Sequence, residues 1–346
     1  MSLKIQYLTC AAALLAATLT AQTPAAPDPQ MKAVLDQLSS MGGKPAETLT
    51  PVEARKQPTP ADAVKALLQK QGKSTAPEAV EKVEDRSIPG PGGQIPIRIY
   101  MPKGTGPFPV VLYIHGGGWV FADLNTYDSS PRALANAAGA VVVSTHYRQG
   151  PENKFPAAHN DVYAAYQWVR SNATYLKGDP GRISVVGESA GGNMALGVAL
   201  MARQKGGPMP VYLGLIYPVA QTGFDTPSYR ENANAKPLNR AMMQWFFKNA
   251  ARPGDAKNPL LALTTEANLK GLPPTTIITA QIDPLRSEGK ELADKMMAAG
   301  VPVAYRNYAG VTHEFFGMGA VVDKAKEAVN VVANELKKAY AASAHQ

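Results

Sequence analysis

The feature that most constrains this chain is a short stretch centred on Ser189. An apolar run at residues 183–186 is typical of a buried β-strand, and Gly187-Glu-Ser-Ala-Gly191 follows it at once. A helix-forming run at 194–203 comes next. Strand, G-x-S-x-G and helix are the parts of a nucleophile elbow, in which the glycines leave room for a sharp turn. The stretch predicts a serine hydroxyl at the tip of that turn. The pattern also occurs by chance in loops, so partners are needed elsewhere in the chain.

Mostly apolar strands recur along the chain, and helices separate them. The strands are expected at residues 110–114, 140–144, 183–186, 211–217, 275–279 and 302–308. The helices are expected at 132–138, from 157, and at 194–203, 287–299 and 324–341. This alternation predicts a mostly parallel sheet that is covered by helices on both faces. Residues 95–100 follow a Pro-Gly-Gly turn and alternate apolar with polar side chains, which predicts a two-stranded antiparallel start.

Two segments depart from that alternation. The first, residues 22–80, begins with a proline-rich linker, and its helical runs are expected at 31–38, from Pro51 with Thr50 as N-cap, and at 62–70. The second, residues 220–262, is rich in polar residues and contains one aromatic helical run at 240–249. An amphipathic helix must dock its apolar stripe, so the first segment predicts either a packed N-terminal appendage or part of a lid over the active site. The second segment predicts an insertion. The expected units are 1–21, 22–80 and 81–346, with a cap insertion at about 220–250.

The first residues have the layout of a signal peptide. Lys4 supplies a positive charge, residues 11–19 form an apolar stretch, and Ala21 offers a small residue for cleavage. The stretch is too short for a comfortable membrane span, and a buried N-terminal helix is the alternative. Removal of residues 1–21 would also remove Cys10, the only cysteine. The signal alone then argues for export, and the mature protein is expected in the periplasm or outside the cell.

The distribution of charge argues against nucleic-acid binding, and the spacing of the histidines argues against a metal site. The formal net charge is +8, but the basic residues are scattered and form no long run. Nucleic-acid binding is therefore not expected. His115, His146 and His159 lack the spacing of metal ligands, which argues against a zinc hydrolase. No metal, no other cofactor and no membrane span is expected.

A serine nucleophile needs a base, and in this strand-turn-helix architecture the chain order is serine, acid, histidine. Two of the five histidines follow Ser189, namely His313 and the penultimate residue His345. A residue so near the terminus is a poor candidate because termini fray. His313 lies between the last strand and the last helix, where a base belongs, although an ordinary surface histidine could also stand there.

The orienting acid is expected to be Asp283. It is the carboxylate after Ser189 that directly follows an apolar strand, and Pro284 ends that strand. Sites in open α/β sheets form at the carboxyl ends of strands. A helix N-cap is the alternative role for this aspartate, and the two roles are compatible.

The oxyanion that forms during acyl transfer needs donors aimed at it. Gly116, Gly117 and Gly118 follow the strand at 110–114, and glycines there let backbone N–H groups approach a ligand closely. The N–H of Ala190, just after the serine, is a further candidate. The alternative is that the triple glycine is a plain flexible turn.

Taken in order, these motifs resemble those of the hormone-sensitive-lipase-like family of α/β-hydrolases, the bacterial family IV esterases of the α/β-hydrolase fold-3 group. The matching motifs are His115-Gly-Gly-Gly118, Tyr147-Arg-Gln-Gly-Pro-Glu152 with Phe155-Pro-Ala157 and Asp161, Gly187-Glu-Ser-Ala-Gly-Gly192, and Asp283-Pro-Leu-Arg286 before His313. The resemblance implies an α/β-hydrolase fold with an eight-stranded sheet and a helical cap. It spans about residues 27–341.

The resemblance also implies roles for matching positions. Ser189 would be the nucleophile, His313 the base and then the acid, and Asp283 its orienter. Gly117, Gly118 and Ala190 would form the oxyanion hole while Gly116 shapes the turn. His115 would brace the glycine loop, and Arg148 and Glu152 would hold the neighbouring loop network. Residues 30–75 and 220–245 would cover the acyl pocket.

Two positions depart from the usual family pattern. Glu188 stands where aspartate is common, and Ser287 replaces the second aspartate of the acid motif. Asp283 itself is kept, so the triad is unaffected. Hydrogen bonds around Glu188 and Ser287, and with them substrate preference, are the open questions.

The expected activity is that of a serine carboxylesterase on short-to-medium-chain acyl esters, with a small-molecule ester as substrate. An amidase, arylamidase or lipase with the same triad is the alternative, and a non-catalytic binding protein on a hydrolase scaffold is a third reading. The aromatic residues that flank the catalytic loops either line the pocket or pack in the core; they are Trp119, Phe121, Tyr217, Phe315 and Phe316. A homodimer is expected to form, if at all, through an edge strand near residues 302–308.

Overall fold

The computed structural model describes residues 25–343 of the chain. The predicted signal peptide, residues 1–21, and His345 lie outside the described residues. Within residues 25–343, no helix combines the length and apolar character that a membrane crossing requires.

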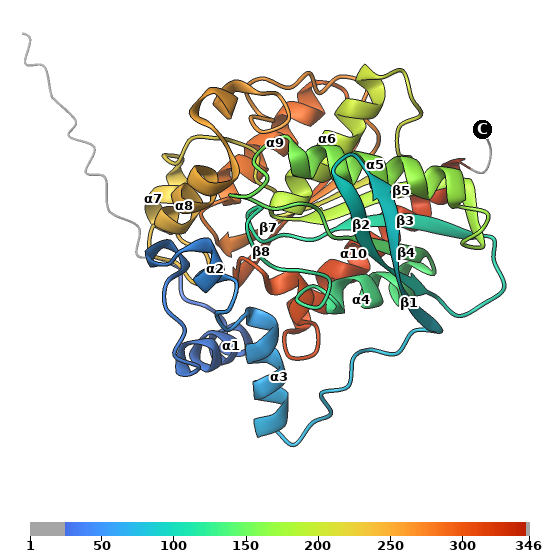
Figure 1. The fold of residues 1–346 in the computed structure, drawn as a ribbon. Helices are drawn as coiled ribbons and strands as arrows, with labels where there is room; N and C mark the ends of the chain where they lie inside the picture. Colours follow the sequence, from blue (N-terminus) through green and yellow to red (C-terminus); the bar gives the residue numbers. More distant parts are fainter. Residues whose placement is uncertain (1–24, 344–346) are drawn as a thin grey trace, which may run out of the picture.

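One eight-stranded sheet forms the centre of the molecule, in the order β1-β2-β4-β3-β5-β6-β7-β8 (Figure 1). β2 is antiparallel to both β1 and β4, and the other neighbouring strands are parallel. The strands are β1 Lys82–Gly90, β2 Gly93–Met101, β3 Phe108–Ile114, β4 Val141–Thr145, β5 Gly178–Glu188, β6 Leu213–Ile216, β7 Thr275–Ile282 and β8 Val303–Thr312. The predicted mostly parallel α/β sheet with an antiparallel start is confirmed.

Element ends near the catalytic motifs differ from the sequence prediction. β6 ends at Ile216 because Tyr217 adopts a positive φ of 35° and leads the chain out of the sheet. β8 continues to Thr312, so His313 follows the strand directly and not after a loop. α6 begins at Ala190, four residues earlier than 194, because the elbow passes from strand to helix within a single residue.

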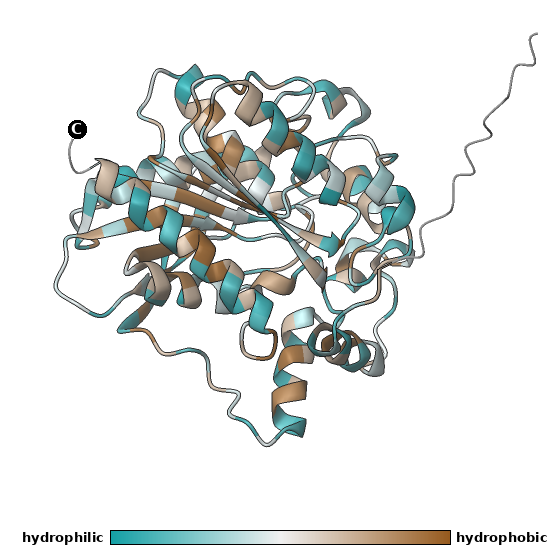
Figure 2. Cartoon of the chain, turned by 180° about the vertical axis from the view of Figure 1, so that it is seen from behind, coloured by the Kyte–Doolittle hydropathy of each residue, from teal (hydrophilic) through white to brown (hydrophobic). Residues whose placement is uncertain are grey.

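Helices cover both faces of the sheet. α5 Ala157–Asn172, α6 Ala190–Gln204 and α9 Arg286–Ala298 pack on one face, while α4 Ser129–Ala138 and α10 Asp323–Ser343 pack on the other. Neighbouring strand residues enter opposite core clusters, as Leu112 and Tyr113 do, because side chains alternate along a strand. Figure 2 shows the resulting pattern, with apolar strands in the middle and polar colour on the outer helix faces.

Three helices precede the sheet, α1 Pro29–Ser40, α2 Pro51–Ala54 and α3 Pro60–Lys70. Each begins with proline and is preceded by an N-cap residue, Asp28, Thr50 or Thr59 respectively, whose side chain accepts a hydrogen bond from a backbone N–H of the first turn. Such caps satisfy N–H groups that have no partner in the helix. α1 and α3 pack on each other and bury Met31 and Leu68 in the core cluster that contains α4 and α10.

Two further helices, α7 Pro227–Glu231 and α8 Arg240–Ala250, lie between β6 and β7. α8 contacts the N-terminal segment: Trp245 Nε1 donates to the Leu49 carbonyl at 3.1 Å, and Asn239 Nδ2 donates to Glu47 at 2.8 Å. Two segments that are far apart in the sequence therefore lie side by side, as Figure 1 also shows for α2 and α8.

Candidate active site

The turn between β5 and α6 places Ser189 in a strained conformation, with φ 57° and ψ −118°. A Cβ atom on Gly187 would lie 2.1 Å from the Gly191 carbonyl oxygen, and one on Gly191 would lie 2.1 Å from the Ile114 carbonyl oxygen. Real side chains cannot occupy that space, so both positions require glycine. Strain of this kind persists where the surrounding structure enforces it, as at active sites.

Ser189, His313 and Asp283 form one hydrogen-bonded chain. His313 Nδ1 lies 2.7 Å from Asp283 Oδ2, and His313 Nε2 lies 2.9 Å from Ser189 Oγ. All three side chains are buried. With Nδ1–H donating to the carboxylate, Nε2 is free to accept the serine proton. Burial by itself lowers the pKa of His313, but the Asp283 carboxylate outweighs it, and the pKa is raised above its ordinary value.

Hydrogen bonds within the loop and from α7 and its flanking residues hold the loop that carries Asp283. The backbone N–H of Leu285 donates to Asp283 Oδ1 at 2.9 Å, and Asn232 Nδ2 donates to the Asp283 carbonyl at 3.2 Å. Ser287 and Ser228 accept each other's backbone N–H at 3.0 and 2.9 Å. Ser287, which departs from the usual family residue, thus ties the aspartate loop to α7.

The glycine loop after β3 adopts conformations that favour glycine. Gly117 has φ 92° and Gly118 has φ 57°, and a Cβ on Gly118 would lie 2.1 Å from the Phe246 ring. Both glycines line the cavity that contains Ser189. The Gly116 carbonyl accepts the Tyr147 hydroxyl at 2.8 Å, so Gly116 is held at the back of the turn.

His115 braces this loop from behind. Its Nδ1 lies 2.9 Å from the Gly116 carbonyl, its Nε2 lies 3.1 Å from His146 Nδ1, and its ring stacks on Tyr147. Burial lowers the pKa of His115 to about 3, so the ring is neutral at ordinary pH. A neutral ring can link a carbonyl on one side to a second imidazole on the other.

Arg55, at the end of α2, was missed by sequence reasoning. Its guanidinium donates to the Val120 carbonyl at 2.9 Å, to the Gly150 carbonyl at 2.8 Å and to Glu152 at 2.7 Å. It therefore fastens the N-terminal segment to the loops beside the glycine turn. Arg148 pairs with Asp161 instead, at 2.8 Å. A lone arginine after a short helix carries no sequence signal for this role.

A cavity of about 500 Å³ opens above the triad. Ser189 and His313 lie at its base, and its walls include apolar side chains of α1 and α8. Those side chains are Leu35, Leu38, Met242 and Phe246. The helical spacing of 31–38 and 240–249 predicts apolar faces, but it does not say that the two faces meet over the serine.

Of the five aromatic residues proposed for the pocket, Phe121 lines the cavity. The expectation for the other four requires correction. Trp119 faces a separate small cavity beside His159. Tyr217, Phe315 and Phe316 are buried in the core on the other side of the triad, where the Tyr217 ring lies 4.4 Å from the His313 ring. Sequence proximity to the triad does not determine the side of the loop to which a side chain turns.

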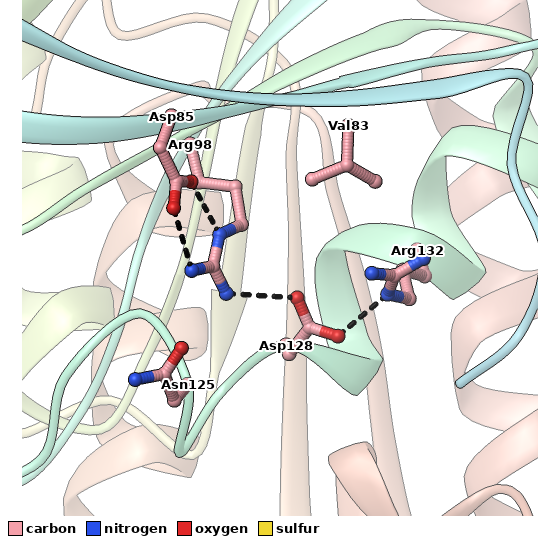
Figure 3. A pocket seen from close by; sticks show the side chains of 6 residues that line it. All are labelled: Val83, Asp85, Arg98, Asn125, Asp128 and Arg132. Carbon is pink, nitrogen blue, oxygen red and sulfur yellow. Dashed lines mark hydrogen bonds and ion pairs between the residues drawn. The ribbon is translucent and has the colours of Figure 1, made fainter. Parts of the chain in front are cut away.

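A second hollow of about 450 Å³ lies on β1, β2 and α4, away from the triad (Figure 3). Arg98 donates to Asp85 at 2.6 Å and to Asp128 at 3.2 Å, and Arg132 donates to Asp128 at 2.5 Å. The charges in this hollow are therefore paired with one another. Both carboxylates that line it, Asp85 and Asp128, are engaged by arginines, and it has no serine or histidine among its lining residues, so the chemistry is assigned to the cavity above Ser189.

A serine at a strand-to-helix turn, backed by a histidine and a buried aspartate, is the arrangement of serine hydrolases. Residues 111–317 match the model of the family described as alpha/beta hydrolase fold. The carboxylesterase NlhH of Mycobacterium tuberculosis is 40% identical over 273 residues, which cover 77% of this chain and 86% of that protein. The ethyl acetate hydrolase of Pseudomonas putida is 31% identical over 300 residues, covering 85% and 92% of the two chains.

Solved structures of esterases support the same family assignment. A hyperthermophilic esterase from the archaeon Pyrobaculum calidifontis superposes with a TM-score of 0.82 at 36% identity, and the match covers 91% of this chain and 98% of that one. The chain belongs to the α/β-hydrolase family, in its hormone-sensitive-lipase-like branch. It is a carboxylic ester hydrolase.

Proposed function

We propose that the protein hydrolyses short-to-medium-chain acyl esters through an acyl-enzyme on Ser189, with His313 as base and acid and Asp283 as its orienter. The hydrogen-bonded chain Asp283–His313–Ser189, with links of 2.7 and 2.9 Å, is the observation that carries this proposal. The cavity of about 500 Å³ supports the limit on substrate size, since pockets of this order hold small molecules.

The reaction follows from the geometry in two halves. Ser189 Oγ attacks the ester carbonyl carbon while His313 Nε2 takes its proton, and the N–H groups of Gly117, Gly118 and Ala190 receive the oxyanion. Nε2 then gives the proton to the leaving alkoxide. In the second half, a water molecule gives a proton to Nε2 and attacks the acyl carbon, and the proton returns to Oγ as the acid leaves.

A chain-length series of p-nitrophenyl esters tests this proposal, with Ser189→Ala as control. We expect the highest kcat/KM at short or medium acyl chains and no burst of p-nitrophenol in the Ser189→Ala variant. A peak at long chains together with interfacial activation would favour a lipase. Faster turnover of matched anilides than of esters would favour an amidase or arylamidase.

We propose that the helices of residues 22–80 and of the insertion at about 220–250 form a cap over the catalytic cavity. The hydrogen bonds of α8 to Leu49 and Glu47, and the shared lining of the cavity, support this. Proteolytic cleavage of the linker between α3 and β1, followed by removal of the N-terminal helices from the rest of the chain, tests this proposal. Removal of these helices should abolish ester turnover if the cap completes the pocket.

We also propose that residues 1–21 are a signal peptide and that the mature protein is periplasmic or secreted. The positive charge, apolar stretch and small residue at Ala21 support this. N-terminal sequencing of the protein from the periplasmic fraction or the medium should begin near residue 22. A full-length chain in the cytoplasmic fraction would contradict the proposal.

A homodimer through β8 is a further proposal. β8 is the last strand of the sheet, and Arg306 and Asn307 on it are exposed. The free edge of such a strand can pair with a second copy. Light scattering on a sizing column should give about twice the monomer mass, and a monomer mass at micromolar concentration would reject this interface.

A further inference from the structure

A second carboxylate lies against the catalytic histidine, on the side opposite Asp283. Glu314 follows His313 with a positive φ of 71°, and this turn brings its Oε1 to 3.8 Å from His313 Nε2. The Tyr127 hydroxyl donates to the Glu314 carboxylate at 2.7 Å. Glu314 also lines the catalytic cavity. The proton transfers of the acyl-enzyme reaction do not involve this group.

Glu188 lies behind Glu314, beneath the serine turn. Its side chain is fully buried, and its two oxygens accept the hydroxyls of Tyr113 and Tyr217. Glu188 and Glu314 both line a small cavity of about 30 Å³ under α3, which is room for one water molecule. Ser130 lines it too. The residue that departs from the family pattern thus shares a small cavity with Glu314, the carboxylate next to the base.

A buried carboxylate, Glu188, and a half-buried one, Glu314, that face one small cavity resist being ionised together. Burial first, and then the charge of Glu314, raise the pKa of Glu188 to about 7. Burial also raises the pKa of Glu314. Among the ion pairs of residues 25–343, neither carboxylate has a lysine or arginine partner. The titratable groups that face the pair are Asp283, His313, Tyr113, Tyr127, Tyr147 and Tyr217.

We propose that Glu314 is a positioning residue that holds and stabilises the His313 imidazolium from its Nε2 side, and that Glu188 sets the charge of Glu314 by sharing one proton with it. The inference rests on the proposed function, because it needs His313 as the base. No proton passes to Glu314 during turnover: the serine proton moves to Nε2 and from there to the leaving alkoxide. Ionised Glu314 makes Nε2 more basic, and a protonated Glu314 makes it less so.

The pH profile of kcat/KM separates this role from a purely structural one. The acid limb reports the pKa of the base in the free enzyme. Loss of the Glu314 charge in Glu314→Gln should move that limb to lower pH by about one unit, the lower end of the effect of an opposite charge at this range. Glu188→Gln should move it to higher pH, because Glu314 then ionises without a competitor. The double variant should follow Glu314→Gln.

Control variants distinguish the effect of a carboxylate beside His313 from the effect of a carboxylate elsewhere on the protein surface. Glu266 is exposed and away from the cavity, so Glu266→Gln should leave the limb in place. Should Glu188→Gln fail to fold, Tyr217→Phe removes one donor to Glu188 and should move the limb in the same direction. An unmoved limb in Glu314→Gln, or a limb that moves to lower pH in Glu188→Gln, overturns the inference. If the unmodified protein neither hydrolyses esters nor reacts with a fluorophosphonate, the proposed function itself is contradicted.

Discussion

The catalytic centre and the cavity wall above it are built in different ways. Ser189, Asp283 and His313 each follow directly on the last residue of a strand, β5, β7 and β8. The wall includes side chains of α1 and α8, and hydrogen bonds join α8 and its N-cap Asn239 to Leu49 and Glu47 in the segment that follows α1. The comparison teaches that the chemistry is fixed by the register of one sheet, whereas substrate fit depends on how two helical segments pack. Changes in the first region should therefore abolish turnover, and changes in the second should redirect it.

The largest effect is expected in the centre. Ser189→Ala should reduce kcat by about 10⁴- to 10⁶-fold, and Asp283→Asn by about 10⁴-fold, because the members of a triad act as a unit. Thermal melting should be nearly unchanged in Ser189→Ala, where only a hydroxyl is lost. The double variant should be no worse than Ser189→Ala alone; additive losses would show that the two residues act separately.

The glycine loop is the point where the two regions touch. A Cβ on Gly118 would collide with Phe246 of α8, so Gly118→Ala should cost about 10²-fold in kcat by displacing an oxyanion donor. Gly139 is a matched control, because it has nearly the same φ, 62° against 57°, and open space around its Cβ position. Gly139→Ala should lower the melting temperature and leave kcat intact. Equal losses of kcat in both variants would rule out the collision as the cause.

The wall is expected to control chain length. Met242 on α8 lines the cavity and is only partly buried. Met242→Ala should move the optimum of the ester series to longer acyl chains, and Met242→Trp to shorter ones, each with a change of about tenfold in relative kcat/KM. Met297, an exposed methionine on α9, gives the control Met297→Ala. A series that does not shift would place the acyl chain elsewhere.

The link between the regions is Arg55. Arg55→Lys keeps the charge but loses the planar set of donors that reaches two carbonyls and Glu152. We expect KM to rise about threefold with little change in kcat, because the lost hydrogen bonds position the cavity wall and not the reacting groups. The effect on KM should be small because the ion pair with Glu152 is partly exposed and therefore weak. A fall in kcat with an unchanged KM would instead assign Arg55 to the catalytic step.

The smallest effect is on stability. The folded-state pKa of Glu188 is about 7, above its unfolded value of 4.5, so the folded protein holds the extra proton between these values. Stability therefore falls as pH rises through this window, by on the order of 1–3 kcal/mol from this group. Urea unfolding at pH 5 and pH 8 should show a smaller loss in Glu188→Gln than in the unmodified protein. An equal loss in both would mean that Glu188 stays ionised at pH 5.

Most of the sheet and the three catalytic positions could be predicted because local pattern carries them. Ser189 lies in a motif, Asp283 follows an apolar strand before proline, and His313 is the histidine left by chain order. Side-chain direction could not be predicted in the same way. Phe121 and Phe315 flank the same loops, yet one lines the cavity and the other enters the core. Contacts between distant segments, such as that of Arg55, depend on packing that no local pattern records.

The measurement that tests the central claim most directly is intact-mass analysis after treatment with a fluorophosphonate, followed by peptide mapping. A serine made nucleophilic by His313 should take up one phosphonyl group on Ser189, with matching loss of p-nitrophenyl ester turnover. The Ser189→Ala variant should take up none. An adduct on another residue, or ester hydrolysis that persists in Ser189→Ala at the original rate, would contradict the account.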